Sequence, residues 1–115
     1  MSIQALNTEL DLLVSKGDMV TAVNNYFAGN VVTKDHDGTV TKNKAGHIAK
    51  MEGFLGAIAK VNGITHHTSA VNGKVSFSEF TFDFDMKDGS KILWHEILRR
   101  EWKDDKIISE QYFKL

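Results

Sequence analysis

The chain has 115 residues, 42% of them hydrophobic and 25% charged, and a formal net charge of -1 at pH 7. This composition predicts one soluble globular domain spanning residues 1–115, and the interspersed charges exclude the clustered basic face of a nucleic-acid-binding protein. The chain has no cysteine, no secretion signal and no long apolar stretch, so we expect a cytoplasmic protein that does not enter a membrane.

Two helices are expected at the start of the chain. Residues at helical spacing predict an amphipathic helix over 3–15, and its apolar positions are Ile3, Leu6, Leu10 and Leu13. Gly17 is suited to end this helix, because glycine adopts the left-handed conformation of a C-terminal cap. Asp18 can then act as the N-cap of a second helix over 19–28.

A short hairpin and a long helix follow. The β-branched run at 31–33 favours a strand, and the turn residues at 36–38 lead into a second strand at 39–42. The strongest helical pattern of the chain then predicts a helix over 44–61. Its apolar stripe comprises Ile48, Met51, Leu55 and Ile58, with Phe54 and Val61 beside it.

The second half of the chain changes to a period of two, which is typical of β-strands. The expected strands are 64–72, 74–87, 91–103 and 106–114, joined by turns at Asn72-Gly73, Asp88-Gly89 and Asp104-Asp105. Helices that precede a four-strand meander predict an α+β domain whose curved sheet is covered by helices on one face.

The sequence distinguishes the two faces of the longest strands. In 74–87 the face that must contact the helices is Phe80, Phe82, Phe84 and Met86. In 91–103 one face holds Ile92, Trp94, Glu96, Leu98, Arg100 and Trp102, and the other holds Lys91, Leu93, His95, Ile97, Arg99 and Glu101. The first set is more apolar and is expected to face inward, although a bulge of one residue would reverse the assignment.

Glu96 and Arg100 would then lie among aromatic side chains. Burying a carboxylate and a guanidinium is costly unless the two are paired or used by a ligand. In a pocket, Arg100 could anchor an anionic or carbonyl oxygen while Glu96 transfers a proton. The alternatives are a structural ion pair, or outward-facing charges if the register is shifted.

The order of these elements, with the segments NVVTKDHDGTVTKNKAG and EWKDDKIISEQYF, resembles the nuclear transport factor 2-like (NTF2-like) superfamily, and within it the SnoaL-like and ketosteroid-isomerase-like small proteins. The resemblance covers nearly the whole chain. It implies a cystatin-like, cone-shaped barrel of three helices on a curved, mostly antiparallel sheet, with an internal pocket and a homodimer through the outer sheet face. The superfamily contains both enzymes and binding proteins, so the fold alone does not name a reaction.

The machinery of the isomerase can be compared position by position. The resemblance places its general-base carboxylate at or next to Asp35. Its tyrosine donor would fall within 10–12 and its protonated carboxylic acid near Leu98, and neither residue type is present there. Asp35 is therefore either a general base in a pocket or part of an exposed turn, which also favours aspartate.

The final strand contributes two further candidates. Glu110 and Tyr112 share one face, and they meet Arg100 if they point inward or Arg99 if they point outward. In the superfamily this strand commonly lines the pocket, so Tyr112 is expected to supply a hydrogen-bonding wall. A salt bridge at the edge of the sheet is the alternative.

We expect no metal site and no cofactor. His66 and His67 are neighbours in a strand and point to opposite faces, and residues 95–99 carry arginine where a zinc motif needs histidine. A calcium loop that starts at Asp35 would need glycine at position 40 and glutamate at position 46, where the chain has Val40 and Gly46. His47, at the start of the long helix, is expected to be exposed to solvent, or else to reach the mouth of a pocket.

These observations predict a protein that binds a small apolar or planar molecule between the long helix and the sheet. The expected lining is Phe54, Phe80, Phe82, Phe84, Trp94, Leu98, Trp102 and Glu110. Any catalysis would be cofactor-free acid–base chemistry of isomerase, cyclase or hydrolase type, with Asp35 or Glu96 moving the proton. Arg100 or Tyr112 would stabilise an oxyanion. The alternative is a non-catalytic ligand carrier or an association domain.

Overall fold

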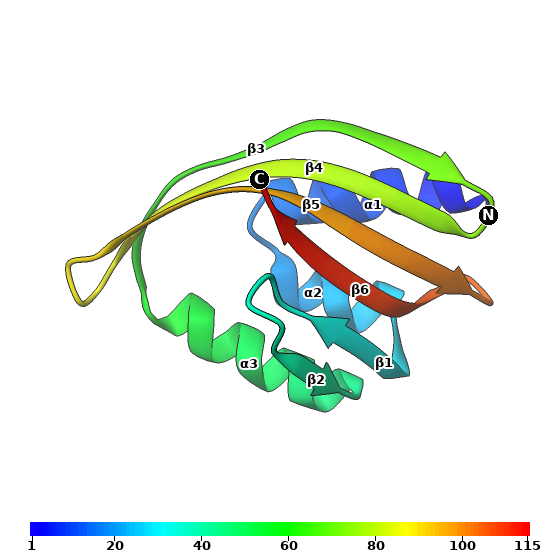
Figure 1. The fold of residues 1–115 in the computed structure, drawn as a ribbon, viewed down its shortest axis with the longest axis horizontal. Helices are drawn as coiled ribbons and strands as arrows, with labels where there is room; N and C mark the ends of the chain where they lie inside the picture. Colours follow the sequence, from blue (N-terminus) through cyan, green and yellow to red (C-terminus); the bar gives the residue numbers. More distant parts are fainter.

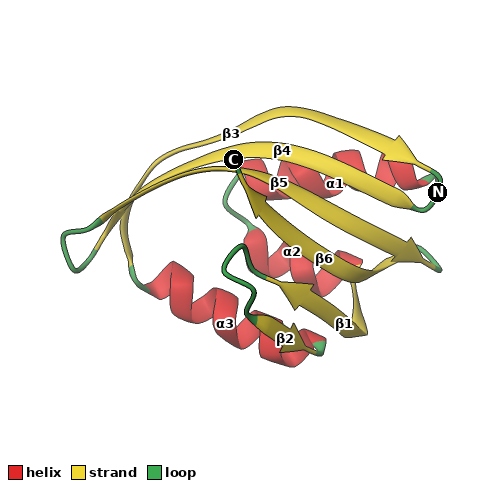
Figure 2. Ribbon diagram, in the orientation of Figure 1, coloured by secondary structure: helices red, strands yellow, loops and turns green.

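The computed structural model describes residues 1–115 and has three helices packed on a six-stranded sheet (Figures 1 and 2). The elements in chain order are α1 Ile3–Ser15, α2 Met19–Tyr26, β1 Phe27–Lys34, β2 Val40–Lys42, α3 Lys44–Gly56, β3 Ile58–Asn72, β4 Val75–Met86, β5 Lys91–Lys103 and β6 Lys106–Lys114. No helix combines the length and the apolar character needed to cross a membrane. The predicted α+β class is confirmed.

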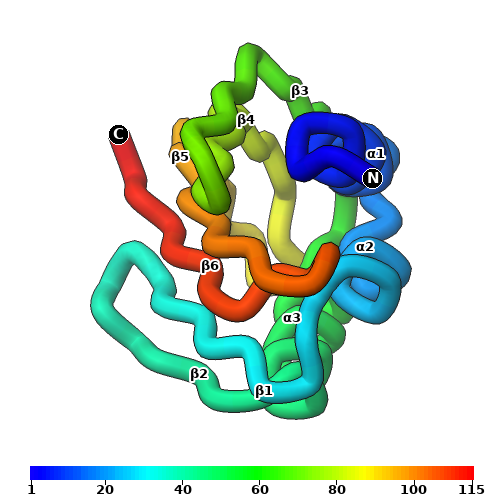
Figure 3. Tube along the Cα trace, turned by 90° about the vertical axis from the view of Figure 1, so that its right-hand side faces the viewer, coloured from blue at the N-terminus to red at the C-terminus, as the bar shows by residue number.

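The strands follow the order β2-β1-β6-β5-β4-β3 in one sheet. Only β1 and β6 are parallel, and all other neighbours are antiparallel. The sheet curls strongly, and all three helices lie on the side toward which it curls (Figure 3). Helix α1 packs on β3 and β4, whereas α3 packs on β1 and β2. The inner face of the sheet is therefore enclosed by helices at both of its edges.

Helix α1 has the limits that the sequence predicts. The hydroxyl of Ser2 accepts a hydrogen bond from the backbone N–H of Ala5 and caps its first turn. Gly17 follows the helix with a φ of 82°, the left-handed conformation that ends helices readily. The second helix is shorter than predicted, because Tyr26 is its last residue and Phe27 already begins β1.

The third helix was predicted to continue to residue 61, and this prediction is wrong. Helix α3 ends at Gly56, and β3 begins at Ile58. Ile58 is paired with Met86 and Val61 with Phe84, so this segment supplies backbone partners to the last residues of β4. Val61 is 53% exposed instead of flanking an apolar helix stripe. Strand pairing with a distant segment has overridden the local helical spacing.

The predicted inner faces of β4 and β5 are confirmed. The two strands pair without a bulge, so that Phe80 stands opposite Glu96 and Phe82 opposite Trp94. The buried residues on these faces include Phe80, Phe82, Phe84, Glu96, Leu98, Arg100 and Trp102. Because the register does not slip, the charged pair of β5 lies inside the fold with the aromatic residues.

Candidate functional site

A cavity of about 370 Å³ lies between α3 and the inner face of β4 and β5, beside the β1–β2 turn. Its lining residues are Met19, Asp35, His36, Asp37, His47, Lys50, Met51, Phe54, Phe82, Phe84, Trp94, Glu96 and Tyr112. A volume of this size accommodates a small organic molecule.

Aromatic rings form the apolar wall of the cavity. Phe54 of α3 stacks on Trp94 of β5 with ring centroids 5.6 Å apart. Its other neighbour is Phe84 of β4, which it meets edge to face at 5.9 Å. Helix and sheet are thus joined by three rings that leave an apolar surface toward the cavity.

Glu96 is the carboxylate that projects from this aromatic wall. It is only 5% exposed and makes no hydrogen bond, and its nearest polar contact is His36 Nδ1 at 3.6 Å. Burial, reinforced by the negative charges of Glu110 and Asp35, raises the pKa of Glu96 to about 7, although Lys114 opposes the shift. Glu96 can therefore gain or lose a proton near neutral pH.

Asp35 lines the same cavity from the β1–β2 turn, but it is paired. Lys50 Nζ of α3 donates to Asp35 Oδ1 at 2.9 Å. The backbone of Asp35 also closes the turn, since its N–H donates to Thr39 and its carbonyl accepts from Gly38. The two roles weighed for Asp35 are compatible, because one residue both forms the turn and reaches the cavity.

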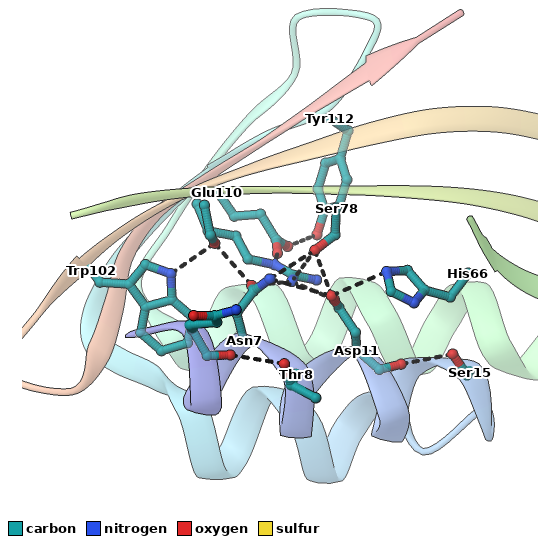
Figure 4. Close-up of polar contacts among 12 residues, drawn as sticks. Asn7, Thr8, Asp11, Ser15, His66, Ser78, Trp102, Glu110 and Tyr112 are labelled. Carbon is teal, nitrogen blue, oxygen red and sulfur yellow. Dashed lines mark hydrogen bonds and ion pairs between the residues drawn. The ribbon is translucent and has the colours of Figure 1, made fainter. Parts of the chain in front are cut away.

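Arg100 is 1% exposed and belongs to a polar cluster between α1 and the sheet. Figure 4 shows Asn7, Asp11, Ser78 and Glu110 of this cluster. Arg100 Nη1 donates to Asp11 Oδ1 at 2.6 Å, and its Nε donates to Glu110 Oε2 at 2.9 Å. Burial alone would lower its pKa, but the two carboxylates outweigh burial and raise the pKa of Arg100. Nη1 also donates to Asn7 and Ser78. The guanidinium is occupied by the protein itself.

Trp102 belongs to the same cluster. Its indole N–H donates to the hydroxyl of Ser76 at 2.9 Å, and that hydroxyl donates to Asn7 Oδ1. No side-chain nitrogen or oxygen that is fully shielded from solvent lacks a hydrogen-bond partner. The cluster is a fully satisfied polar core, which ties α1 to β4 and β5.

Tyr112 and His47 connect this cluster to the cavity. The hydroxyl of Tyr112 donates to Glu110 and lies 3.4 Å from His47 Nε2, while His47 Nδ1 lies 3.3 Å from the Thr33 hydroxyl. His47 is 1% exposed, which corrects the expectation of a solvent-exposed histidine. Burial lowers the pKa of His47, so the ring is neutral at pH 7.

The residues expected at the site separate into two groups. The cavity holds Asp35, Glu96, Tyr112, Phe54, Phe82, Phe84 and Trp94. The others do not line it: Leu98, Arg100 and Glu110 border a smaller apolar space of about 60 Å³, while Phe80 and Trp102 are core residues. The cavity covers only part of the inner face of the sheet, and these residues lie on the part that is packed in the core.

Several residues that line the cavity were not predicted as site residues, although their spacing in the sequence indicates that they share one helix face. His47, Lys50, Met51 and Phe54 follow one another at helical spacing and thus share one face of α3. The apolar members had been predicted as a stripe and His47 had been considered at the mouth of a pocket, whereas Lys50 had not been recognised. No group of three or more His, Asp or Glu side chains lies close enough together to hold a metal ion.

This strongly curved α+β sheet, closed by three helices, is the cone-shaped fold of the NTF2-like proteins. No family model matches the chain, and no curated protein matches its sequence. Similar solved structures include a protein from Mesorhizobium loti described as SnoaL-like polyketide cyclase, with 22% identity, a TM-score of 0.89 and coverage of 98% of this chain and 99% of that chain.

Two further structures share the fold. An NTF2-like protein of unknown function from Burkholderia pseudomallei has 12% identity and a TM-score of 0.79, over 100% of this chain and 92% of that one. A protein from Catenulispora acidiphila with a ketosteroid isomerase-like fold, in complex with trimethylamine, has 14% identity and a TM-score of 0.70. The match covers 82% of this chain and 73% of that chain. At such identities the likeness establishes the common fold and leaves the activity open.

Proposed function

We propose that the protein binds a small, largely apolar molecule in the cavity and that Glu96 exchanges a proton with it. The chemistry would be cofactor-free acid–base catalysis of isomerase, cyclase or hydrolase type. One structure of the same fold was determined with a small organic molecule, trimethylamine, which supports ligand binding as a use of this fold. Since the chain has no cysteine, we also expect it to act in the reducing cytoplasm.

The observation that carries this proposal is the environment of Glu96. A carboxylate that is 5% exposed normally has hydrogen-bond donors, yet Glu96 has none within reach. Its pKa of about 7 suits a general base or acid at physiological pH. Asp35 is less suited to this role, because Lys50 already neutralises it at 2.9 Å.

The groups that would stabilise a developing oxyanion differ from those expected from the sequence. Arg100 does not line the cavity, and the hydroxyl proton of Tyr112 is directed to Glu110. The donors that remain at the cavity are Lys50 and His36. Either could face an oxygen of the ligand while Glu96 takes a proton from the adjacent carbon or heteroatom.

Proton exchange on a simple ketone tests this proposal. We expect the protein to accelerate deuterium exchange at the α-carbons of cyclohexanone in D₂O, followed by NMR, and Glu96→Gln to return the rate to background. Glu101→Gln is the matched control, because Glu101 lies on the opposite face of the same strand. Equal rates for wild type and Glu96→Gln would exclude Glu96 as the base.

A non-catalytic carrier is the second candidate. It is favoured by the internal hydrogen bonds of Arg100 and Tyr112, because both expected oxyanion donors already donate to Glu110 and are not free to donate to a ligand. A carrier would bind apolar ligands, and Phe54→Ala would weaken that binding, but cyclohexanone exchange would stay at background in every variant. The two candidates are thereby separated.

A homodimer through the outer sheet face is part of the same proposal. Leu93 on β5 is 61% exposed, and Phe113 on β6 is 42% exposed next to Ile97, its partner in the strand register. An apolar surface of this kind is typical of a contact between copies. Light scattering after size exclusion should give twice the mass of one chain, and Leu93→Lys should reduce it to one.

A further inference from the structure

We infer that the ligand of the cavity is a small amine, bound as its ammonium cation with an N–H on Glu96 and its apolar part against Phe54 and Phe84. This inference rests on the proposed function, because it names the class of molecule that the proposed site takes. It is carried by the missing donor at Glu96, by the balance of charge inside the fold and by the aromatic wall.

The first argument is the missing donor at Glu96. The side chain lines the cavity at 5% exposure, and the single nitrogen near it, His36 Nδ1, is 3.6 Å away, too far for a hydrogen bond. A buried carboxylate is stable when it accepts charge-assisted hydrogen bonds. An ammonium group in the cavity would supply them, whereas a ligand carboxylate at this position would be repelled.

The second argument is the balance of charge behind and beside Glu96. On the inner side of the sheet, Asp11 and Glu110 share one guanidinium, that of Arg100, at 2.6 and 2.9 Å. Asp35 has Lys50 as its own partner. His66 Nε2 also lies 3.4 Å from Asp11. Glu96 has only His36 Nδ1 at 3.6 Å and the more distant Lys114, so it is the buried carboxylate with no fixed cation in contact, and its surroundings carry an excess of negative charge from Glu110 and Asp35. A cationic ligand corrects this excess.

The third argument is the surface next to Glu96. Phe54 and Phe84 meet at 5.9 Å and Phe54 stacks on Trp94, so aromatic faces and edges border the carboxylate. Aromatic rings attract cations, and the ammonium of Lys114 already lies 5.9 Å from the centre of Trp94. Alkyl or aryl groups on the amine would bury their apolar area against the same rings.

The inference also fits proton transfer at this site. Glu96 can take one proton from the bound ammonium: the N–H bond breaks, an O–H bond forms on the carboxyl group, and the nitrogen keeps the electron pair. The free amine is then a nucleophile inside the cavity. The step needs no group other than Glu96 and the amine itself.

The pH dependence follows from the groups that face Glu96. These are His36 and Asp35 from the β1–β2 turn, and Glu110 and Lys114 from β6. Lys50 and His47 of α3 line the same cavity, where Lys50 pairs with Asp35. Burial and the two carboxylates raise the pKa of Glu96 to about 7. An ammonium ligand pairs with the ionised carboxylate, so its affinity should rise about tenfold from pH 6 to pH 8 as Glu96 loses its proton.

Three probes of matched shape test the inference: benzylamine, benzyl alcohol and benzoate, each titrated into the full chain by isothermal calorimetry at pH 8. We expect benzylamine to bind at least tenfold more tightly than benzyl alcohol, and benzoate to bind least. Equal affinities for the amine and the alcohol would overturn the inference while leaving a binding cavity in place. If none of the three binds, the inference and the proposed binding function both fail.

Two variants assign the preference to Glu96. Glu96→Gln should remove the tenfold preference for benzylamine over benzyl alcohol and its rise with pH. Glu101→Gln should behave as wild type. A preference that survives in Glu96→Gln would overturn the inference. If Glu96→Gln does not fold, the wild-type pH series decides, because an affinity that stays constant from pH 6 to pH 8 also contradicts it.

Discussion

Arg100 and Glu110 form an ion pair across the β5–β6 hairpin, with Nε 2.9 Å from Oε2 and both side chains almost completely buried. They are direct partners in the strand register. The same guanidinium pairs with Asp11 of α1, with Nη1 2.6 Å from Asp11 Oδ1. Removing three charges from water is costly, and the pairing offsets that cost only when all three groups are present. The cluster therefore fixes how α1 lies on the sheet.

The first prediction concerns Arg100→Met. Without the guanidinium, Asp11 and Glu110 remain buried side by side, and the free energy of unfolding should fall by about 3–5 kcal/mol. Urea denaturation at pH 7 measures the change.

Arg99→Met is the matched control, because Arg99 is the neighbour of Arg100 on the outer face, where it pairs with the half-exposed Glu101. We expect a loss of less than about 1 kcal/mol there. Similar losses in the two variants would contradict a structural role for the buried cluster.

The second prediction concerns the pH dependence of stability. Burial raises the pKa of Glu96 to about 7 from an ordinary value of 4.5. Between these values the native state binds more protons than the unfolded state. The contribution of Glu96 to stability is therefore fully present below the unfolded pKa and is lost as pH rises from there through 7, by up to about 3 kcal/mol.

Glu96→Gln should remove this decrease. Urea denaturation at pH 5 and pH 8 would then give a flatter pH dependence for Glu96→Gln than for Glu101→Gln. A decrease of the same size in both variants would show that another group causes it.

The third prediction concerns the tautomer of His47. Tyr112 directs its hydroxyl proton to Glu110, so its oxygen can only accept from His47 Nε2, and the Thr33 hydroxyl can donate to Nδ1. We expect the Nε2–H tautomer and, since burial lowers the pKa of His47 from its ordinary value, a neutral ring at pH 7. Long-range ¹H–¹⁵N NMR spectra identify both states, and an imidazolium spectrum at pH 7 would contradict the prediction.

The fourth prediction separates the two cavity carboxylates. In the cyclohexanone exchange assay, Asp35→Asn should lower the rate less than tenfold, because Lys50 already neutralises Asp35. Glu96→Gln should lower it at least a hundredfold, the usual contribution of a general base. The opposite order would transfer the role of base to Asp35, the position that resembles the isomerase.

The sequence by itself predicted most of the fold, because the patterns that specify it are local. Alternation in β4 and β5 identified the inner face that carries Phe82 and Glu96, and the turn at Asp88-Gly89 sets the register that keeps it there. The helical spacing of α1 and the glycine after it gave the limits of that helix. These signals depend only on neighbouring residues.

The tertiary structure decided what depends on distant partners. The end of α3 at Gly56 follows from the pairing of β3 with β4, which local spacing does not contain. The sequence indicated Glu96 and Arg100 as one functional pair, but in the fold they have separate environments. Asp11 of α1 forms an ion pair with Arg100, whereas Glu96 has only His36 Nδ1 near it, at 3.6 Å. The charge left free in a folded interior depends on which side chains meet there, and only the packing of α1 and α3 on the sheet determines that.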